Sequence, residues 1–581
     1  MHQRTFARIA PMRARAFFYG CMAIALFLAW RLYDVQAING AAYAGKALAQ
    51  RSDTVEVFAR RGSILDRDGN VLVRSLPSQS VYAVPREIVD PDATAAKLTA
   101  IFGKLDPAVV SALHDKHLWF VWIARKVPHS VAVRIASLDL PGVTLKQEET
   151  GVRVDTAGRL LSTVLGFVGT DENGLDGIEY AYDGILRGRS GRVTLEADEF
   201  GRPIPFGSER VVTPSQPGSN LELTIDPYLQ FVAERALATQ VSAYRALDGT
   251  AIVMDPWTGE ILAMANLPNF DPNRFWQYGD DARRDRAVLD AYEPGSTYKL
   301  VTAAAALESH KVTLSSRFPA HDVIEVGGQT IHNAEDGFMA GTGGSETLGQ
   351  IIQYSHNVGA AEVGLAIGAK TFYDMERKAG FGDPSGVGLP GENPGIVPPP
   401  NVWSGSSLAT MSFGQGVSVT PLAMARYYCA IANGGLLVQP RIVRAMYDQQ
   451  GNLVRQFPPA APRRIFSALT AAQLRGFLRD VVLHGTGDPT AQVPGYATAG
   501  KTGTASMVVN GLYRSGYYAA SFIGMVPYER PRYVIYVKVE RPVGAYYGSV
   551  VAAPAFAAIA RGAMLHAGVL PRADAVARNG R

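Results

Sequence analysis

At 581 residues the chain is too long for one compact domain, and its length predicts about two to four domains. Hydrophobic residues make up 47% of it, which is enough to bury sizeable cores, and its net charge of +4 is too small to indicate a nucleic-acid-binding protein. Its two cysteines, Cys21 and Cys429, suit neither a disulfide framework nor a thiolate zinc site.

Basic and then apolar residues open the chain. Residues 4–15 contain four arginines and no acidic residue, and residues 16–30 are uncharged and mostly apolar. With the apolar residues that follow, this run approaches the ~20 residues that a spanning helix needs, and its basic flank predicts a cytoplasmic N-terminus. We predict a tail over residues 1–15 and an anchor over residues 16–38 in the cell inner (cytoplasmic) membrane, with the bulk of the chain periplasmic or otherwise extracytoplasmic. A cleaved signal peptide is the alternative.

Residues 39–219 are predicted to form an N-terminal module of mixed, extended structure. Its charged segments end in turns, such as Asp68-Gly69 before the apolar residues 71–73. It has no pair of acidic residues placed for glycosyl transfer. We interpret it as a dimerisation, spacing and interaction module without chemistry of its own.

The pattern changes near residue 220, and we assign residues 220–570 to a second domain and residues 571–581 to a tail. Asp226-Pro227 is a typical helix start. Strand-like runs lie early and late, with a mostly helical section between them: 221–225, 250–254, 260–265, 497–505, 517–525 and 533–540. This order predicts an α+β domain whose antiparallel sheet is covered by helices on both faces.

A hydroxyl and an amine lie three residues apart at Ser296 and Lys299, before an Ala-rich run. Pro294 and Gly295 predict a helix that begins near Ser296, and positions i and i+3 share a helix face. A serine hydroxyl needs a base, and lysine serves as one only if its pKa is lowered by a helix dipole or a nearby cation. Alone, this S-x-x-K pattern is more often a capping serine followed by a solvated lysine.

Two more short motifs follow. Ser355-His356-Asn357 lies between two helical runs, and Lys501-Thr502-Gly503-Thr504 lies in the first of the late strands. The patterns S-x-x-K, S-x-N and K-T-G each occur once and in this order, so together they are a strong signal.

With these motifs the chain resembles the class B penicillin-binding proteins of the cell-division type, from the anchor almost to the C-terminus. Longer strings carry the resemblance: Arg61-Gly62-Ser63-Ile64-Leu65-Asp66-Arg67, Gly177-Ile178-Glu179, Met254-Asp255-Pro256, Ser412-Phe413-Gly414-Gln415-Gly416, His484-Gly485-Thr486-Gly487 and Ser521-Phe522-Ile523-Gly524. The chain departs from the family at Arg153-Val154-Asp155-Thr156, where the family often shows Arg-x-Tyr-Pro. At His356 serine is common in the class, and we interpret this histidine as a surface or capping residue.

The resemblance implies a penicillin-binding/serine β-lactamase-like fold and a D,D-transpeptidase. It implies that Ser296 is the nucleophile, Lys299 its base, Ser355 a proton relay to the leaving amine, and Asn357 a holder of the substrate backbone. Ser296 would attack between the two terminal D-alanines of a stem peptide, and a neighbouring stem peptide would then accept the acyl group. β-Lactams would acylate the same serine, and no cofactor or metal would be needed.

The third motif is implied to bind the terminal carboxylate of the substrate through Lys501, Thr502, Gly503 and Thr504. Lys501 would also lower the pKa of Lys299 by like-charge repulsion. The backbone N–H groups of Ser296 and Thr504 would form the oxyanion hole.

The N-terminal half has no E-D-x-x-F motif of a glycosyltransferase. A SEDS-family glycosyltransferase is therefore the implied partner, met through the anchor and the N-terminal module, together with lipid-linked glycan strands and other division proteins. Alternatives are an elongation- or sporulation-type class B transpeptidase, a β-lactam sensor, or a β-lactamase. A class A β-lactamase would need an E-x-x-x-N base pattern, and a sensor would need an intracellular output domain.

Overall fold

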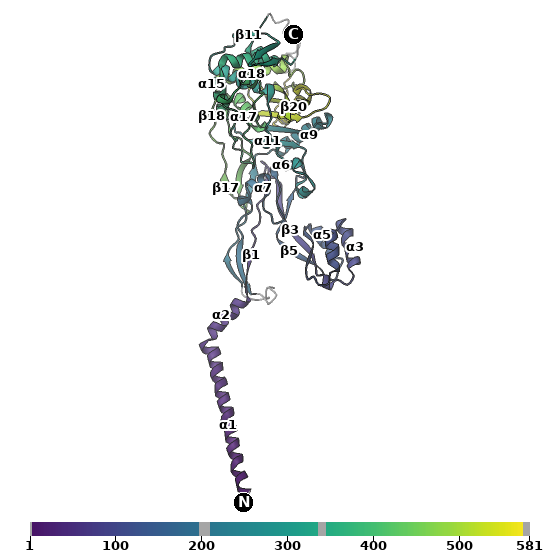
Figure 1. Ribbon diagram of the computed structural model, residues 1–581, viewed down its shortest axis with the longest axis vertical. Helices are drawn as coiled ribbons and strands as arrows, with labels where there is room; N and C mark the ends of the chain where they lie inside the picture. The colour runs from purple at the N-terminus through teal and green to yellow at the C-terminus, as the bar shows by residue number, and fades with distance from the viewer. Residues whose placement is uncertain (1–2, 197–208, 335–343, 510, 573–581) are drawn as a thin grey trace. The chain divides into compact units, whose positions relative to one another are not determined.

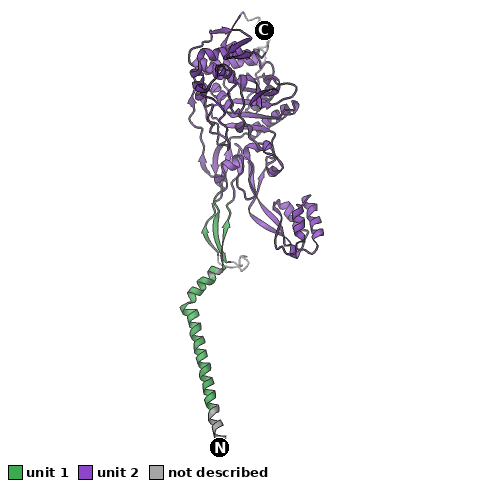
Figure 2. Cartoon of the chain, in the orientation of Figure 1, with its two compact units in different colours: residues 1–59, 189–216 green, residues 60–188, 217–581 purple. Residues whose placement is uncertain are grey.

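The computed structural model describes residues 3–196, 209–334, 344–509 and 511–572 (Figure 1). The chain divides into two compact units (Figure 2). The first comprises Met1–Ala59 with Arg189–Gln216, and the second comprises Arg60–Gly188 with Pro217–Arg581.

The first unit contains a long N-terminal helix and a small sheet. Helix α1 (Gln3–Tyr33) continues through a π-helical turn, η1 (Asp34–Ile38), and α2 (Gly40–Arg51) follows. Residues Pro11–Ile38 are long and apolar enough to cross a membrane, and none of that window is buried. Among the described residues no other helix passes this test. The sheet has the order β1-β6-β7: β1 (Ser52–Val57), β6 (Gly191–Glu196) and β7 (Glu209–Thr213).

The centre of the second unit is a five-stranded antiparallel sheet with the order β10-β9-β21-β20-β19. Its strands are β9 (Asp248–Met254), β10 (Ile261–Leu267), β19 (Ala499–Val509), β20 (Leu512–Val526) and β21 (Tyr533–Glu540). The early strands predicted at 250–254 and 260–265 and the three late strands are therefore present. They meet because β21 pairs with β9, about 280 residues away in the chain.

Successive side chains of each strand point to opposite faces of this sheet, and the two faces pack into different hydrophobic cores. In β21, Val534 and Tyr536 pack into one hydrophobic core, whereas Ile535 and Val537 pack into another. The second core is closed by α9 (Pro227–Ala243) and α20 (Ala553–His566). Helices of the middle section close the first core: α11 (Arg286–Leu289), α12 (Lys299–Glu308), α13 (Leu348–Tyr354), α14 (Asn357–Ile367), α15 (Ala369–Lys378), α16 (Ser407–Met411), α17 (Pro421–Ala432) and α18 (Ala468–His484). The predicted α+β fold with both faces covered is confirmed.

A second, larger sheet joins residues 60–188 to the rest of the unit. Its order is β17-β16-β8-β2-β3-β4, with β5 also paired to β3. Its strands are β2 (Ile64–Leu65), β3 (Val71–Ala83), β4 (Val121–Val127), β5 (Val143–Asp155), β8 (Asn220–Leu223), β16 (Val443–Tyr447) and β17 (Leu453–Gln456). Helices α3 (Pro91–Phe102), α4 (Pro107–His114) and α5 (His129–Ala136) pack on the far end of β3 and β4, around a small core of their own.

A buried ion-pair network ties this region together. Arg61 lies 2.5 Å from a carboxylate oxygen of Glu179 and 2.6 Å from one of Asp183. Arg153 donates to the other Glu179 oxygen at 2.7 Å. Because Arg61 and Glu179 are 1% exposed, removal of either would break a buried ion pair of this network, and breaking such a pair typically costs about 3–5 kcal/mol.

Candidate functional site

The three sequence motifs meet at one cavity of the second unit. It has a volume of about 630 Å³. Residues of all three motifs line it: Ser296, Ser355, His356, Asn357, Thr502 and Thr504. Lys299 and Lys501 lie beneath these residues and are fully buried.

Ser296 lies in a short 3-10 helix, η4 (Gly295–Tyr298), and the α-helix α12 begins only at Lys299. The segment is fixed by its backbone. The Gly295 N–H donates to Gly414 at 3.1 Å, and the Tyr428 hydroxyl donates to the carbonyl of Thr297 at 2.9 Å. The predicted helix start near Ser296 is confirmed, although the first turn is a 3-10 helix and not an α-helix. Among the described residues the Ser296 hydroxyl caps no backbone N–H, which leaves it available for chemistry.

Lys299 projects toward the second motif. Its amine donates to the Ser355 carbonyl at 2.5 Å, to the Asn357 side-chain oxygen at 2.8 Å and to the Ser355 hydroxyl at 3.3 Å. Among the described residues the Ser296 hydroxyl makes no side-chain hydrogen bond. The Lys299 amine follows one turn later in the chain, and it is hydrogen-bonded to the second motif instead. The i, i+3 spacing of Ser296 and Lys299 predicted that both lie on one helix face, but it did not predict the hydrogen-bond partners of Lys299.

Burial is the main reason why the pKa of Lys299 lies well below its ordinary value, and the charge of Lys501 adds to this effect. Glu346 acts in the opposite direction. Burial also lowers the pKa of Lys501, to about 7. The sequence predicted repulsion from Lys501; the structure makes desolvation the larger cause.

Ser355 is placed by a backbone conformation that serine rarely adopts. It ends α13 with φ of +64°, in the left-handed region, and Asn357 begins α14. This reversal turns the Ser355 hydroxyl toward both lysines, since Lys501 donates to it at 2.8 Å and Lys299 at 3.3 Å. A continuous hydrogen-bonded path thus runs from Lys299 through Ser355 to Lys501.

The third motif lies on β19 at the edge of the five-stranded sheet, against η4. The Thr502 hydroxyl is 2.7 Å from that of Thr486, and the Thr504 hydroxyl accepts from the Gly548 N–H at 3.1 Å. A Cβ at Gly503 would lie 2.3 Å from the Ser521 hydroxyl and 3.2 Å from the Pro294 carbonyl oxygen, so any larger residue here would force its neighbours to move.

His356 differs from its prediction as a surface or capping residue. It is 5% exposed, and its Nδ1 lies 2.6 Å from a carboxylate oxygen of Glu346. Its backbone occupies the N-cap position of α14, but its side chain makes no capping bond. The sequence offered no signal for Glu346, which comes from a separate short strand. Thr486 lies in the string 484–487 that carries the resemblance, but no contact with the third motif was predicted for it.

Three aromatic side chains close one side of the cavity: Tyr518, Tyr546 and Tyr547. The Tyr518 and Tyr546 rings stack with centroids 4.4 Å apart, and those of Tyr546 and Tyr547 are 4.5 Å apart. These stacked rings add aromatic surface to a lining that is otherwise rich in polar side chains.

Two family models match the chain. The penicillin binding protein transpeptidase domain matches residues 249–561, and the penicillin-binding protein dimerisation domain matches residues 56–223. Stage V sporulation protein D of Bacillus subtilis is 34% identical, over 97% of this chain and 88% of its own. Peptidoglycan D,D-transpeptidase FtsI of Escherichia coli is 32% identical, over 95% of this chain and 92% of its own.

Solved structures show the same fold over most of the chain. Penicillin binding protein 3 of Mycobacterium tuberculosis, complexed with aztreonam, matches with a TM-score of 0.69 and 30% identity, over 89% of this chain and 99% of that one. Penicillin binding protein 2X of Streptococcus thermophilus matches with a TM-score of 0.72 and 25% identity, over 91% and 82% of the two chains.

Proposed function

This chain belongs to the class B penicillin-binding proteins, and from that premise we propose that it is a peptidoglycan D,D-transpeptidase that works through an acyl-enzyme at Ser296. The observation that carries the proposal is the buried hydrogen-bonded path Lys299–Ser355–Lys501. It lies beside Ser296, whose hydroxyl makes no capping hydrogen bond. Two lysines of lowered pKa around one hydroxyl are suited to moving a proton.

In the first step Ser296 attacks the carbonyl between the two terminal D-alanines. Neutral Lys299 takes the hydroxyl proton, and the backbone N–H groups of Ser296 and Thr504 stabilise the oxyanion. Ser355 passes a proton to the leaving amine of the last D-alanine, and Asn357 holds the substrate backbone. The acceptor amine of a second stem peptide then attacks the ester, releases Ser296 and forms the cross-link.

Substrate binding itself prepares the base. With a pKa of about 7, Lys501 is only partly protonated near neutral pH. A substrate carboxylate bound by Lys501, Thr502 and Thr504, with Gly503 allowing the close approach, favours protonated Lys501. Protonated Lys501 in turn lowers the pKa of Lys299 by repulsion. A ligand without the carboxylate would bind without this activation.

We assign the chemistry to residues 220–570 and the membrane anchor to residues 16–38, with the N-terminus in the cytoplasm and the catalytic domain outside the inner membrane. Residues 39–219 are proposed to meet a SEDS-family glycosyltransferase and other division proteins. The relatives include FtsI and a sporulation protein, and we favour a role in septal wall synthesis. Depletion that produces filaments would support this role, whereas round cells would indicate elongation.

The test of the activity uses the full chain in detergent with a pentapeptide ending in D-Ala-D-Ala and an acceptor amine. Wild type should give a product whose mass equals donor plus acceptor minus D-alanine. Ser296→Ala should give none, while the matched control Ser315→Ala, at an exposed serine, should behave as wild type. Product formation by Ser296→Ala at the wild-type rate would refute the assignment.

A further inference from the structure

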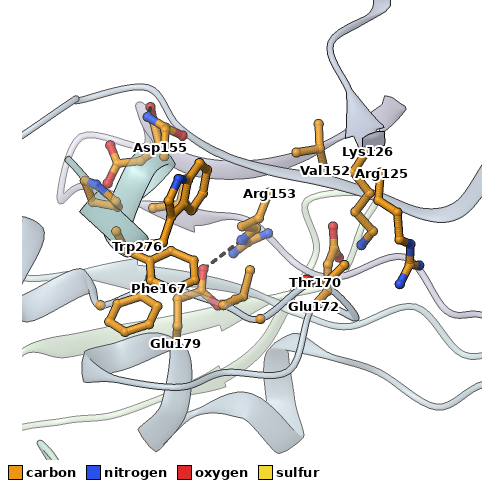
Figure 3. A pocket seen from close by; sticks show the side chains of 17 residues that line it. Arg125, Lys126, Val152, Arg153, Asp155, Phe167, Thr170, Glu172, Glu179 and Trp276 are labelled. Carbon is orange, nitrogen blue, oxygen red and sulfur yellow. Dashed lines mark hydrogen bonds and ion pairs between the residues drawn. The ribbon is translucent and has the colours of Figure 1, made fainter. Parts of the chain in front are cut away.

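A second cavity lies in residues 60–188 and 217–581, away from the three motifs. Its volume is about 340 Å³, and it opens between the end of β5, the loop at residues 166–172 and the 3-10 helix η3 (Pro272–Gln277). Figure 3 shows Asp155 and Trp276 toward one end, Lys126 and Glu172 toward the other, and Arg153 between them. The proposed transpeptidase reaction uses none of these residues.

Buried polar atoms without hydrogen-bond partners distinguish this cavity. Four side chains that line it each have a buried nitrogen or oxygen with no hydrogen-bond partner among the described residues: Lys126 Nζ, Arg153 Nη2, Asp155 Oδ2 and Glu172 Oε1. Arg153, Asp155 and Glu172 are each at least nine-tenths buried. An unpaired buried polar group costs about 1–3 kcal/mol and more when charged, so a ligand that supplies hydrogen-bond partners to these atoms would be bound favourably.

The backbone at this cavity is also held in rare conformations. Lys126 has φ of +52° and Glu172 has φ of +57°, although neither is glycine. Such conformations cost about 1–3 kcal/mol each and cluster at binding and catalytic sites. They place an amine and a carboxylate at the same end of the cavity (Figure 3).

The departure from the family pattern falls here as well. Asp155 and Thr156 stand where the family often has Tyr and Pro, so a short acidic side chain replaces an aromatic one. Aromatic side chains also line the cavity, and Figure 3 shows Trp276 and Phe167 toward the same end as Asp155. The rings of Phe167 and Phe275 stack at 4.2 Å, and Trp276 meets Phe275 edge-on at 5.4 Å.

We propose that this cavity binds a diamino acid through a head group that carries an ammonium and a carboxylate on one carbon. The carboxylate pairs with Lys126 Nζ and Arg153 Nη2, and the ammonium pairs with Glu172 Oε1. The carbon chain lies along Phe167 and Trp276, and the polar far end reaches Asp155. The volume falls within the range of small-molecule sites, and few polar groups on an apolar wall are typical of them.

Two sources present this chemistry: a free diamino acid, and a stem peptide whose diamino acid keeps one free amino-acid end, as meso-diaminopimelate would. The second source rests on the proposed function, because it makes peptidoglycan itself the ligand. The occupancy of this cavity, and with it the bound state of the N-terminal region, would then depend on the state of the peptidoglycan. The first source needs no assumption about activity.

The test is titration calorimetry of the full chain in detergent with two probes, meso-diaminopimelate and a tripeptide that carries it as third residue. We expect one-to-one binding of at least one probe, and the tighter probe identifies the source. Blocking the free ammonium by acetylation, or the carboxylate as an amide, should weaken binding at least about tenfold, which corresponds to about 1.4 kcal/mol.

Variants separate this cavity from the cavity of the three motifs. Lys126→Met and Glu172→Gln should each weaken binding at least about tenfold while thermal unfolding stays near wild type. Lys146→Met, at an exposed lysine on β5, is the matched control and should bind as wild type. Lys501→Met should also bind as wild type, so a failed transpeptidase assay would leave this result intact.

Absence of heat with both probes would overturn the proposal and leave the cavity to water. Binding that survives both Lys126→Met and Glu172→Gln, or is lost only in Lys501→Met, would overturn it too, since the probe would then occupy another site. Equal binding of the acetylated and amidated probes would refute the zwitterionic head group.

Discussion

Lys501→Met exchanges a buried amine for an apolar side chain of similar length, and its effect on stability should depend on pH. Lys501 is fully buried, and burial lowers its pKa from 10.5 to about 7. The folded protein therefore disfavours the protonated form, whereas the unfolded chain keeps it up to about pH 10.5. This unfavourable contribution is complete below pH 7 and disappears as pH rises to 10.5.

The size of the effect follows from the two pKa values. Each pKa unit is worth about 1.4 kcal/mol, so protonated Lys501 costs the fold about 5 kcal/mol at low pH. At pH 7.5 the cost is still about 4 kcal/mol, and at pH 9.5 it is about 1.4 kcal/mol. The methionine also loses the bonds of the amine to the Ser355 hydroxyl and to Thr502, about 1 kcal/mol each, and this loss changes little with pH.

The measurement is chemical denaturation of both proteins at pH 7.5 and 9.5. The stability of Lys501→Met relative to wild type should fall by about 2.5 kcal/mol between these pH values, although the variant is inactive. The control Lys370→Met, at an exposed lysine, should show no such change. A stability of Lys501→Met relative to wild type that stays constant or rises with pH would refute the reasoning that burial, and not function alone, sets the state of Lys501.

Three further predictions concern the same domain. Glu376 accepts a hydrogen bond from the Tyr298 hydroxyl at 2.8 Å, and burial raises the pKa of Glu376 to about 8. Wild type should therefore lose stability as pH rises from 4.5 to 8, and Glu376→Gln should remove this dependence in thermal melts. Parallel pH curves for the two proteins would contradict the prediction. A Cβ at Gly414 would lie 2.2 Å from the Gly295 carbonyl oxygen, so Gly414→Ala should lower the free energy of unfolding by about 2–4 kcal/mol and slow acylation. The control Gly451→Ala, at a glycine with the same positive φ but open space around it, should lower it by about 1 kcal/mol. Equal losses of stability in chemical denaturation would show that the clash is not the cause. Ser355→Ala breaks the path between the two lysines and should slow β-lactam acylation about 10²–10⁴-fold in stopped-flow assays, and an unchanged rate would remove Ser355 from proton transfer.

Much of the fold was predictable from the sequence because local signals agreed. Asp226-Pro227 started α9 as predicted, its carboxylate accepting from two backbone N–H groups, and the strand predicted at 533–540 matches β21. The order of strands in the sheet was not predictable, because the pairing of β21 with β9 depends on contacts between distant segments.

In the candidate site, too, local sequence signals predicted the main residues, whereas contacts between distant segments were not predictable. Motif order and spacing led to Ser296, Lys299, Ser355 and Lys501, which the structure brings together at one cavity. The hydrogen bonds of Lys299 and the left-handed Ser355 were beyond the sequence, because both depend on how α13 and α14 meet. The buried pair of His356 and Glu346 was missed for a related reason: a histidine beside a helix start gives no sign of burial or of a carboxylate from another strand.

The most direct test of the account is mass spectrometry of the full chain after reaction with benzylpenicillin. We predict that the intact protein gains the mass of one penicillin and that peptide mapping places it on Ser296. Acylation of Ser296→Ala to the same extent, or a modification mapped to Ser355 or to any other residue, would contradict the claim that Ser296 forms the acyl-enzyme.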